Sequence, residues 1–202
     1  MEIQMGCFLK QFNKFAYNLT KNKYFINERL DNNKTGFLYN LMKEAHIERY
    51  IFARNCISKE IKNEKLRILD AACGDGYGSQ ILADLNCIVY GIDKDYSSME
   101  KRHGGKNITL LEMDCTNLQF PSNYFDFVVS FETIEHIKNC DLFLREIKRV
   151  LREDGTLILS TPNRSFCDVL FGVYANKVNP YHIKEFKTHE LKKILEQKFR
   201  SW

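Results

Sequence analysis

The sequence is poor in the residues that interrupt or cross-link a chain. Its 202 residues include only 3 Pro and 10 Gly, which argues against a linker-rich or low-complexity protein. No apolar run approaches the roughly 20 residues of a membrane-spanning helix. Lys10 and Lys14 interrupt the first residues where a secretory signal would be continuously apolar. The seven cysteines form no C-x-x-C pair, which excludes an obvious zinc ribbon or disulfide framework. We therefore expect a globular, cytoplasmic protein with reduced thiols.

Residues 1–34 differ in composition from the rest of the chain. They are rich in Asn, Lys and Phe, and they carry six Lys and Arg against three acidic residues. One helix is expected within them, over Cys7–Leu19. From Phe37 to Ile61 the apolar residues recur at helical spacing, which predicts one long helix or two joined ones. We therefore predict an N-terminal extension over 1–34 and a single domain over 35–202.

Beyond this helix, short apolar runs alternate with helical segments. Strands are expected over Leu66–Ala71, Cys87–Ile92, Ile108–Met113, Phe125–Phe131 and Thr156–Ser160, and helices over Gly76–Leu85, Ser97–His103, Asp141–Leu151 and Thr188–Lys198. Strands that are apolar throughout and separated by helices imply a parallel sheet buried on both faces. The sequence therefore predicts an α/β fold with a doubly wound, mainly parallel sheet. In such folds, ligands bind beyond the carboxyl ends of the strands.

The turn after the first expected strand, Asp70 to Gly78, has the pattern of a ligand-binding loop. Gly74 and Gly76 allow a sharp bend and a close approach to a ligand, and the next helix begins with free N–H groups. Asp93 ends the second strand, where an acid can bind both hydroxyls of a ribose. Ser79 stands where a dinucleotide fingerprint needs Gly or Ala, which argues against an NAD-dependent oxidoreductase. A different nucleoside ligand is therefore expected.

Several segments, in order, resemble the motifs of class I S-adenosylmethionine-dependent methyltransferases. They are Ile68–Gly76, Gly91–Asp93, Asp114–Cys115, Tyr124–Ser130, Glu135–Ile137, Glu146–Leu151, Gly155–Leu157 and Ser160–Asn163. From about residue 45 to 198 the chain is similar to the ubiquinone-biosynthesis-like subgroup (methyltransferase types 11 and 23), with features of bacterial surface-glycan enzymes. The resemblance implies a Rossmann-like fold and S-adenosyl-L-methionine as cofactor. It also implies a small-molecule or glycan-type acceptor that is methylated at oxygen.

The resemblance also implies which residues contact the cofactor. Gly74 and Gly76 would lie against the methionine part and Asp93 on the ribose. Asp114 would bind the adenine amine with Cys115 beside it, unless Asp114 is only a surface turn acid. The complete set is Arg49, Asp70, Ala72, Gly74, Gly76, Asp93, Lys94, Asp114, Cys115, Ser130 and Phe131.

Some of these residues have a structural alternative. Asp70 either binds the ammonium group, through water or the loop backbone, or caps a helix. Arg49 either reaches the methionine carboxylate, which a guanidinium fork fits well, or points into solvent. Ser130 and Phe131 either line the cleft or belong to the core. Ala72 stands where the family commonly has Gly, and its small methyl group is expected to be tolerated.

Histidines are the candidate catalytic groups. Methyl transfer from a sulfonium is an in-line displacement, for which the protein supplies alignment and, for a hydroxyl acceptor, a base. His136, after the fourth strand, and His182, in the later loop, are the candidates because imidazole titrates near neutrality. For both, the alternative is a structural role. Glu132 and Glu135 lie near His136 without a spacing that indicates metal ligands, so no metal is expected.

Two other functions remain open from the sequence. One is a catalytically silent cofactor-binding or interaction protein, left by truncation of a longer enzyme. The other is nucleic-acid methylation, which usually carries an Asn/Asp-Pro-Pro-aromatic motif after the fourth strand. This chain has Ser130–Thr133 at that place and no appended RNA-binding module. The sequence therefore argues against a nucleic-acid substrate.

The end of the chain suggests an incomplete sheet. The methyltransferases that this sequence resembles carry two further strands after the helix expected over Thr188–Lys198, and this sequence ends at Trp202. The strand Thr156–Ser160 would then be an edge with no charge or Pro to prevent pairing. We expect either a fragment of a longer enzyme or a homodimer in which a second copy covers this edge.

Overall fold

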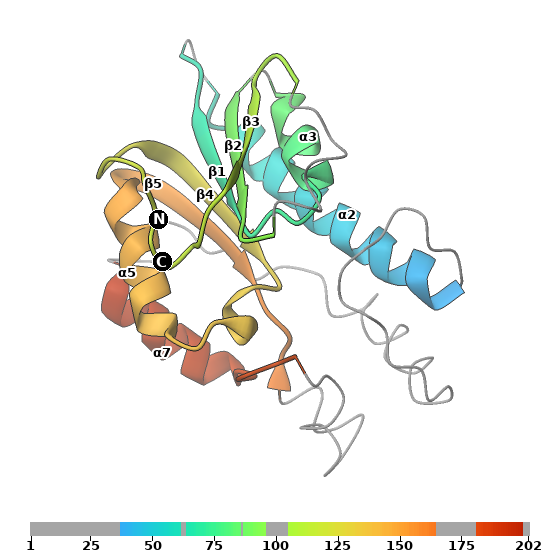
Figure 1. The fold of residues 1–202 in the computed structure, drawn as a ribbon, viewed down its shortest axis with the longest axis vertical. Helices are drawn as coiled ribbons and strands as arrows, with labels where there is room; N and C mark the ends of the chain where they lie inside the picture. The colour runs from blue at the N-terminus through green and yellow to red at the C-terminus, as the bar shows by residue number, and fades with distance from the viewer. Residues whose placement is uncertain (1–36, 62–63, 86, 96–104, 165–180, 200–202) are drawn as a thin grey trace.

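In the computed structural model, the described residues are 37–61, 64–85, 87–95, 105–164 and 181–199. The helices expected over Cys7–Leu19 and Ser97–His103 lie outside them. The described residues form one open sheet with helices on both sides (Figure 1). No helix within these ranges is long and apolar enough to span a membrane.

Within the described residues the sheet has five strands that are all parallel, in the order β3-β2-β1-β4-β5. Its strands are β1 (Arg67–Ala71), β2 (Ile88–Asp93), β3 (Ile108–Glu112), β4 (Phe125–Phe131) and β5 (Leu151–Ser160). The central strands β1 and β4 are buried along almost their whole length, as expected for strands covered on both faces. The strand order reverses between β1 and β4, where folds of this class bind ligands. The predicted doubly wound parallel sheet is thereby confirmed.

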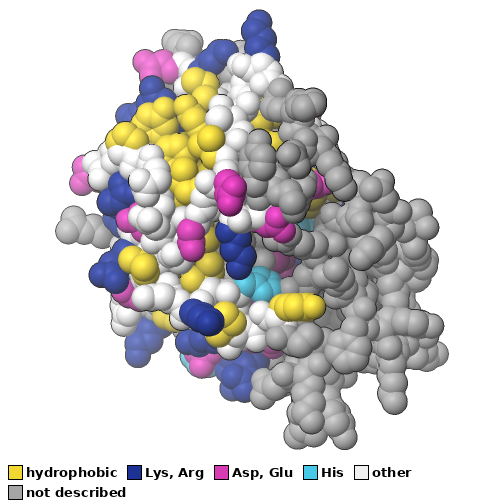
Figure 2. Space-filling view, in the orientation of Figure 1, with side chains coloured by type: hydrophobic (Ala, Val, Ile, Leu, Met, Phe, Trp, Pro, Cys, Tyr) yellow, Lys and Arg dark blue, Asp and Glu magenta, His cyan; other side chains and the backbone are white. Residues whose placement is uncertain are grey.

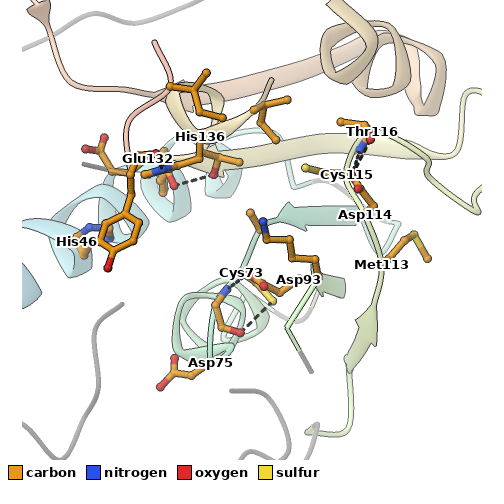
Figure 3. A pocket seen from close by; sticks show the side chains of 18 of the residues that line it. His46, Cys73, Asp75, Asp93, Met113, Asp114, Cys115, Thr116, Glu132 and His136 are labelled. Atoms are coloured by element: carbon orange, nitrogen blue, oxygen red, sulfur yellow. Dashed lines mark hydrogen bonds between the residues drawn. The ribbon is translucent and has the colours of Figure 1, made fainter. Parts of the chain in front are cut away.

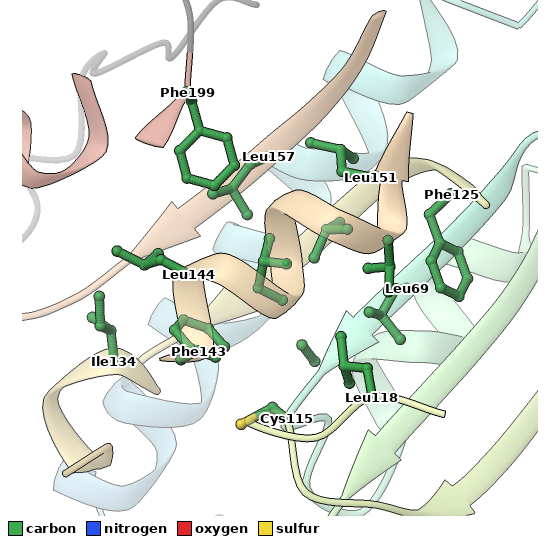
Figure 4. Packing of buried hydrophobic residues seen from close by; sticks show 14 of the residues in the cluster. Leu69, Cys115, Leu118, Phe125, Ile134, Phe143, Leu144, Leu151, Leu157 and Phe199 are labelled. Carbon is green, nitrogen blue, oxygen red and sulfur yellow. The ribbon is translucent and has the colours of Figure 1, made fainter. Parts of the chain in front are cut away.

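In the described part of the chain, two helices cover each face of the sheet. Helices α2 (Phe37–Ser58) and α3 (Tyr77–Ala83) pack on one face, and α5 (Cys140–Val150) and α7 (Thr188–Lys198) on the other (Figure 1). Helix α5 is strongly amphipathic and inserts Phe143, Leu144 and Ile147, all fully buried, against the sheet (Figure 4). Leu195 of α7 and Phe199 join the same cluster. This apolar spacing explains why the helix between β4 and β5 was predictable.

Strand β5 begins earlier than expected. The sequence suggested a turn at Asp154-Gly155 followed by a strand from Thr156. Instead, Leu151 already pairs with Phe125, and the register shifts before Thr156 meets Phe127. Leu151 is buried and packs against Gly155, where a Cβ atom would lie 2.8 Å from its side chain. The local turn signal therefore marks an irregularity inside the strand. Among the described strands, β5 pairs with β4 alone and forms one edge of the sheet.

Arg149, at the end of α5, fastens the segment that leads into β4. Its guanidinium donates to the carbonyl oxygens of Phe120 and Leu118, each at 2.7 Å, and to the Glu146 carboxylate at 2.8 Å. Glu146 also accepts from the Leu118 N–H at 2.8 Å. These bonds and the adjacent charge hold the pKa of Glu146 below its ordinary value. A planar fork is needed because the acceptors lie in different directions.

Arg149→Lys is expected to lower the free energy of unfolding by about 1–2 kcal/mol, because an ammonium group cannot satisfy all these acceptors. Urea denaturation of both proteins measures the loss. Arg145→Lys is the matched control on the same helix. Arg145 is 60% exposed and forms a surface ion pair with Asp141, so its replacement changes stability by less than about 0.5 kcal/mol. Equal losses in both variants would contradict this role for Arg149.

Candidate functional site

A cavity of about 900 Å³ lies at the carboxyl ends of the strands. The loops after β1, β2, β3 and β4 line it, together with one face of helix α2 (Figure 3). Cys73 and Asp93 lie on one side of the cavity, and Asp114 and Cys115 on another. His46, Glu132 and His136 form the third side. The pocket thus lies where the sheet topology predicts a ligand site.

The loop after β1 has a left-handed backbone at three positions. Ala72, Gly74 and Gly76 have φ angles of 64°, 58° and 82°. The Cys73 N–H donates to the Ile92 carbonyl at 2.9 Å, which ties this loop to β2. A Cβ atom on Gly74 would meet nothing within 4 Å, so φ, rather than crowding, favours glycine there. The loop can therefore lie close to a ligand in the pocket.

Ala72 is strained by this conformation, because a left-handed φ costs an L-residue about 1–2 kcal/mol. Glycine avoids this cost but loses about 0.5–1 kcal/mol through unfolded-state entropy. Ala72→Gly is therefore expected to raise the free energy of unfolding by roughly 0.5–1 kcal/mol. The control Ala45→Gly, in the interior of helix α2, should lower it by about 1 kcal/mol. Urea denaturation measures both, and a loss of stability in Ala72→Gly would show that the loop is not strained.

Acidic residues lie at the carboxyl ends of the next two strands: Asp93 ends β2, and Asp114 follows β3 by two residues. The Asp93 carboxylate accepts from the Gly74 N–H at 3.0 Å and from the Asp95 N–H at 2.9 Å, so it joins the β1 and β2 loops. Asp114 accepts from both the backbone N–H and the hydroxyl of Thr116 at 2.7 Å, which lowers its pKa. Beside it, burial raises the pKa of the Cys115 thiol to about 12. Cys115 therefore contributes an apolar wall.

The pocket brings together most of the residues that the sequence singled out. Those that line it are Ala72, Gly74, Asp93, Lys94, Asp114, Cys115, Phe131 and His136. Four loops that are separated in the sequence meet in this one cavity. The assignment of these residues to particular cofactor atoms remains a prediction.

Other predicted residues lie behind the lining. Asp70 is fully buried and accepts from the Tyr50 hydroxyl at 3.1 Å and from the Ser79 hydroxyl at 2.7 Å. Its burial raises its pKa to about 7. Ser130 is also buried and donates to the Ala71 carbonyl at 3.1 Å. Both residues take core positions that support the loops. Gly76 is the N-cap residue of α3 and is not among the residues that line the pocket.

Arg49 faces an acidic group beside the pocket. It is 8% exposed, and its guanidinium lies 3.5 Å from the Glu132 carboxylate. Glu132 lines the pocket, has a φ of 49°, and accepts from the Ser160 hydroxyl at 2.7 Å. Such a backbone conformation in a non-glycine residue is concentrated at functional sites. Arg49 therefore contributes charge next to the pocket without lining it.

Sequence reasoning did not single out part of the lining. His46 and Tyr50, four residues apart on α2, both face the pocket. The Tyr50 ring packs edge-on against Tyr77 and Phe131, at centroid distances of 5.5 and 5.0 Å. The i, i+4 spacing was the available signal, but the direction of that face depended on packing against the sheet.

The far end of the pocket is formed by a 3-10 turn, η1 (Ile134–His136), and the segment 181–186. The rings of His136 and His182 lie 5.0 Å apart, with His136 in the lining and His182 behind it. Burial raises the pKa of Glu135 to about 8. Apolar side chains and a histidine lie together on this face of the molecule (Figure 2). Tyr181 and Ile183 line the pocket although they are 62% and 52% exposed.

Comparison with known proteins gives this pocket a family context. Residues 69–159 match the methyltransferase domain family. A Mycobacterium tuberculosis protein named as a probable S-adenosylmethionine-dependent methyltransferase is 33% identical over 130 residues, which are 63% of this chain and 46% of that protein. The ubiquinone biosynthesis O-methyltransferase of Bradyrhizobium diazoefficiens is 30% identical over 59% of this chain and 46% of its own length. The chain spans about half the length of these curated relatives.

Solved structures share the fold. A methyltransferase from Archaeoglobus fulgidus has a TM-score of 0.57 at 19% identity, covering 73% of this chain and 67% of that one. The plantazolicin methyltransferase BpumL, solved with a monoazolic desmethylPZN analog and S-adenosylhomocysteine, has a TM-score of 0.62 at 16% identity, over 77% and 65% of the two chains. Sequence match and fold agree: residues 69–159 match the methyltransferase domain family, and the described sheet has the fold of solved methyltransferases.

Proposed function

We propose that this chain binds S-adenosylmethionine in the pocket at the carboxyl ends of the strands. It would then transfer the methyl group to an oxygen of a small-molecule or glycan-type acceptor. The observation that carries the proposal is the hydrogen bond from the Gly74 N–H to the Asp93 carboxylate. It places a loop with left-handed backbone and an acid side by side in one cavity. A ribose with its hydroxyls on Asp93 would leave its 5′ substituent next to that loop.

The remaining lining suits the other parts of the cofactor. Asp114 can accept from the adenine amine, and the buried Cys115 thiol offers an apolar surface to the base. Phe131 and Tyr50 present aromatic rings, which attract a sulfonium cation. The cofactor supplies the reactive carbon. The chain's own residues bind it, exclude water from it and hold it facing the end of the pocket near His136.

Support for oxygen as the acceptor atom comes from the relatives named as ubiquinone biosynthesis O-methyltransferases. Tyr181 and Ile183 offer an apolar contact surface for an acceptor at the pocket end. In the transfer, the acceptor oxygen forms its bond to the methyl carbon as the carbon–sulfur bond breaks, and the hydroxyl proton must leave. His136, in the lining, remains the predicted base for that proton.

Two further features of the proposal concern the whole protein. A cytoplasmic location would suit its cysteines, because all five that the structure describes are free thiols. A second copy of the chain could cover the edge strand β5, whose outer side has no neighbouring strand in the described part of the chain. Sedimentation at micromolar concentration tests this dimer.

Isothermal titration with S-adenosylhomocysteine tests cofactor binding, with NAD⁺ as the comparison ligand. We expect micromolar affinity for S-adenosylhomocysteine and none for NAD⁺. Turnover of methyl-labelled cofactor with a panel of sugar nucleotides and phenolic acceptors then separates an enzyme from a silent cofactor-binding protein. Absence of S-adenosylhomocysteine binding in folded protein would refute the proposal.

A further inference from the structure

The Glu135 carboxylate is buried beside the pocket with one oxygen unsatisfied. The residue is 0% exposed, and its Oε2 atom accepts from the Thr161 hydroxyl at 2.8 Å. Its Oε1 atom has no hydrogen-bond partner among the residues that the structure describes. A buried carboxylate oxygen without a partner is costly, so native proteins retain one where it has a ligand or a function. A cation is the natural partner of this atom.

Two imidazole rings meet this carboxylate. Glu135, His136 and His182 each offer a ligand atom, and these atoms all lie within 4.8 Å of one another. The Nδ1 atom of His136 is hydrogen-bonded to the Tyr181 carbonyl at 3.0 Å, and Nδ1 of His182 to the Glu185 carboxylate at 2.8 Å. Histidines that bind metals characteristically make such a bond through the other ring nitrogen. The outer partners therefore orient both Nε2 atoms as ligands.

The backbone holds the two parts of this cluster together. The N–H groups of Ile183 and Lys184 donate to the Glu135 carbonyl at 2.8 and 3.1 Å. His136 and His182, 46 positions apart in the sequence, are thereby fixed on one wall of the pocket. A site whose ligands are positioned by main-chain bonds costs little further ordering when an ion binds.

We propose that Glu135, His136 and His182 bind a divalent transition-metal ion at the acceptor end of the pocket. Two imidazoles and one carboxylate suit Zn²⁺, Co²⁺ or Fe²⁺, whereas Mg²⁺, Ca²⁺ and Mn²⁺ favour sites built of oxygen ligands. Ligand atoms about 2.0–2.1 Å from a tetrahedral ion lie roughly 3.4 Å apart. The three candidate ligand atoms lie within 4.8 Å of one another, so small side-chain rotations bring them to this spacing.

The position of the ion gives it a role, and this step rests on the proposed function. Three protein ligands leave a coordination position open, and His136 lines the pocket, so that position faces the acceptor. An acceptor hydroxyl bound there would lose its proton to solvent more readily, because the cation stabilises the oxyanion. Its oxygen would then attack the methyl carbon as the carbon–sulfur bond breaks. In this arrangement His136 and His182 are ligands, so the bound cation takes the place of the histidine base that the proposed function assigns to His136.

Co²⁺ titration of the full chain, after chelator treatment, tests the site by visible absorption and by calorimetry. We expect one equivalent to bind, with loss of at least about tenfold in affinity in Glu135→Gln and in His182→Ala. His189→Ala is the matched control, because His189 is exposed on α7, away from the cluster. Binding through cysteine would reveal itself by thiolate charge-transfer absorption, which the proposed site lacks.

Glu185→Gln provides a milder variant in case a ligand replacement impairs folding. It removes the charge of the carboxylate that is hydrogen-bonded to His182, and its expected effect is a loss of about tenfold in Co²⁺ affinity. S-adenosylhomocysteine affinity should persist in all these variants, which separates a failure of the metal site from a failure of the cofactor site. Absence of Co²⁺ binding by the wild-type chain would overturn the proposal. So would wild-type affinity in folded Glu135→Gln and His182→Ala, or binding with a thiolate spectrum.

Discussion

Asp93→Ala is expected to lower the affinity for S-adenosylhomocysteine by at least about tenfold while the fold persists. The carboxylate would bind both ribose hydroxyls, and each charge-assisted hydrogen bond contributes roughly 1.5–3 kcal/mol before compensation. The substitution also removes the acceptor of the Gly74 N–H at 3.0 Å, so the loop loses its tie to β2. Both effects act in the same direction. Isothermal titration measures the affinity, and circular dichroism checks the fold.

Two further variants separate these effects. Asp93→Asn keeps an oxygen that can accept from Gly74 but removes the charge, so it should retain the loop and lose most of the ribose binding. Asp154→Ala is the control, because Asp154 is an 86% exposed acid in β5 and should leave the affinity unchanged. Unchanged affinity in folded Asp93→Ala would remove the ribose assignment.

The sheet could be predicted because its signals are local. Strand β4 has the bounds expected from its apolar run, Phe125–Phe131, and its start follows a turn at Asn123, whose φ is 55°. Strand β5 was placed too late because Asp154-Gly155 reads as a turn. Only its pairing with β4 shows that Leu151 already belongs to the strand. Two residues that pair across 26 positions of sequence cannot be recognised from the pattern of their immediate neighbours.

In the candidate site, too, the residues marked by local sequence signals could be predicted, and those brought together by tertiary packing could not. Gly74 and Asp93 were found because a turn and a strand end have recognisable residues, and the sheet then brings them together. Asp70 was expected at the ligand because it is an acid that leads into the turn after the first strand. Its side chain instead meets Tyr50, which is 20 positions earlier on α2. The Glu135 and His182 cluster is likewise a product of tertiary structure, since no spacing in the sequence relates its members.

The buried carboxylate of Asp70 should make the stability of the protein depend on pH. Burial raises its folded-state pKa from the ordinary 3.8 to about 7, although hydrogen bonds from Ser79 and Tyr50 oppose the shift. The folded protein therefore holds this proton more tightly than the unfolded chain. The stability contributed by protonation is fully present below about pH 4, and it is lost as the pH rises towards and through 7. The loss is at most about 4 kcal/mol, since each pKa unit corresponds to about 1.4 kcal/mol.

Asp70→Asn should remove this dependence, because an amide remains neutral and can still hydrogen-bond with both hydroxyls. Urea denaturation between about pH 5 and pH 8 is the measurement, with the variant expected to lose less stability than the wild type over that range. Asp84→Asn is the matched control, because Asp84 is exposed at the end of α3 and its replacement should leave the wild-type slope in place. Parallel pH profiles for wild type and Asp70→Asn would mean that Asp70 is ionised in the folded protein across this range. The bonds from Tyr50 and Ser79 would then compensate the charge fully, and α2 and α3 would be joined through a buried anion.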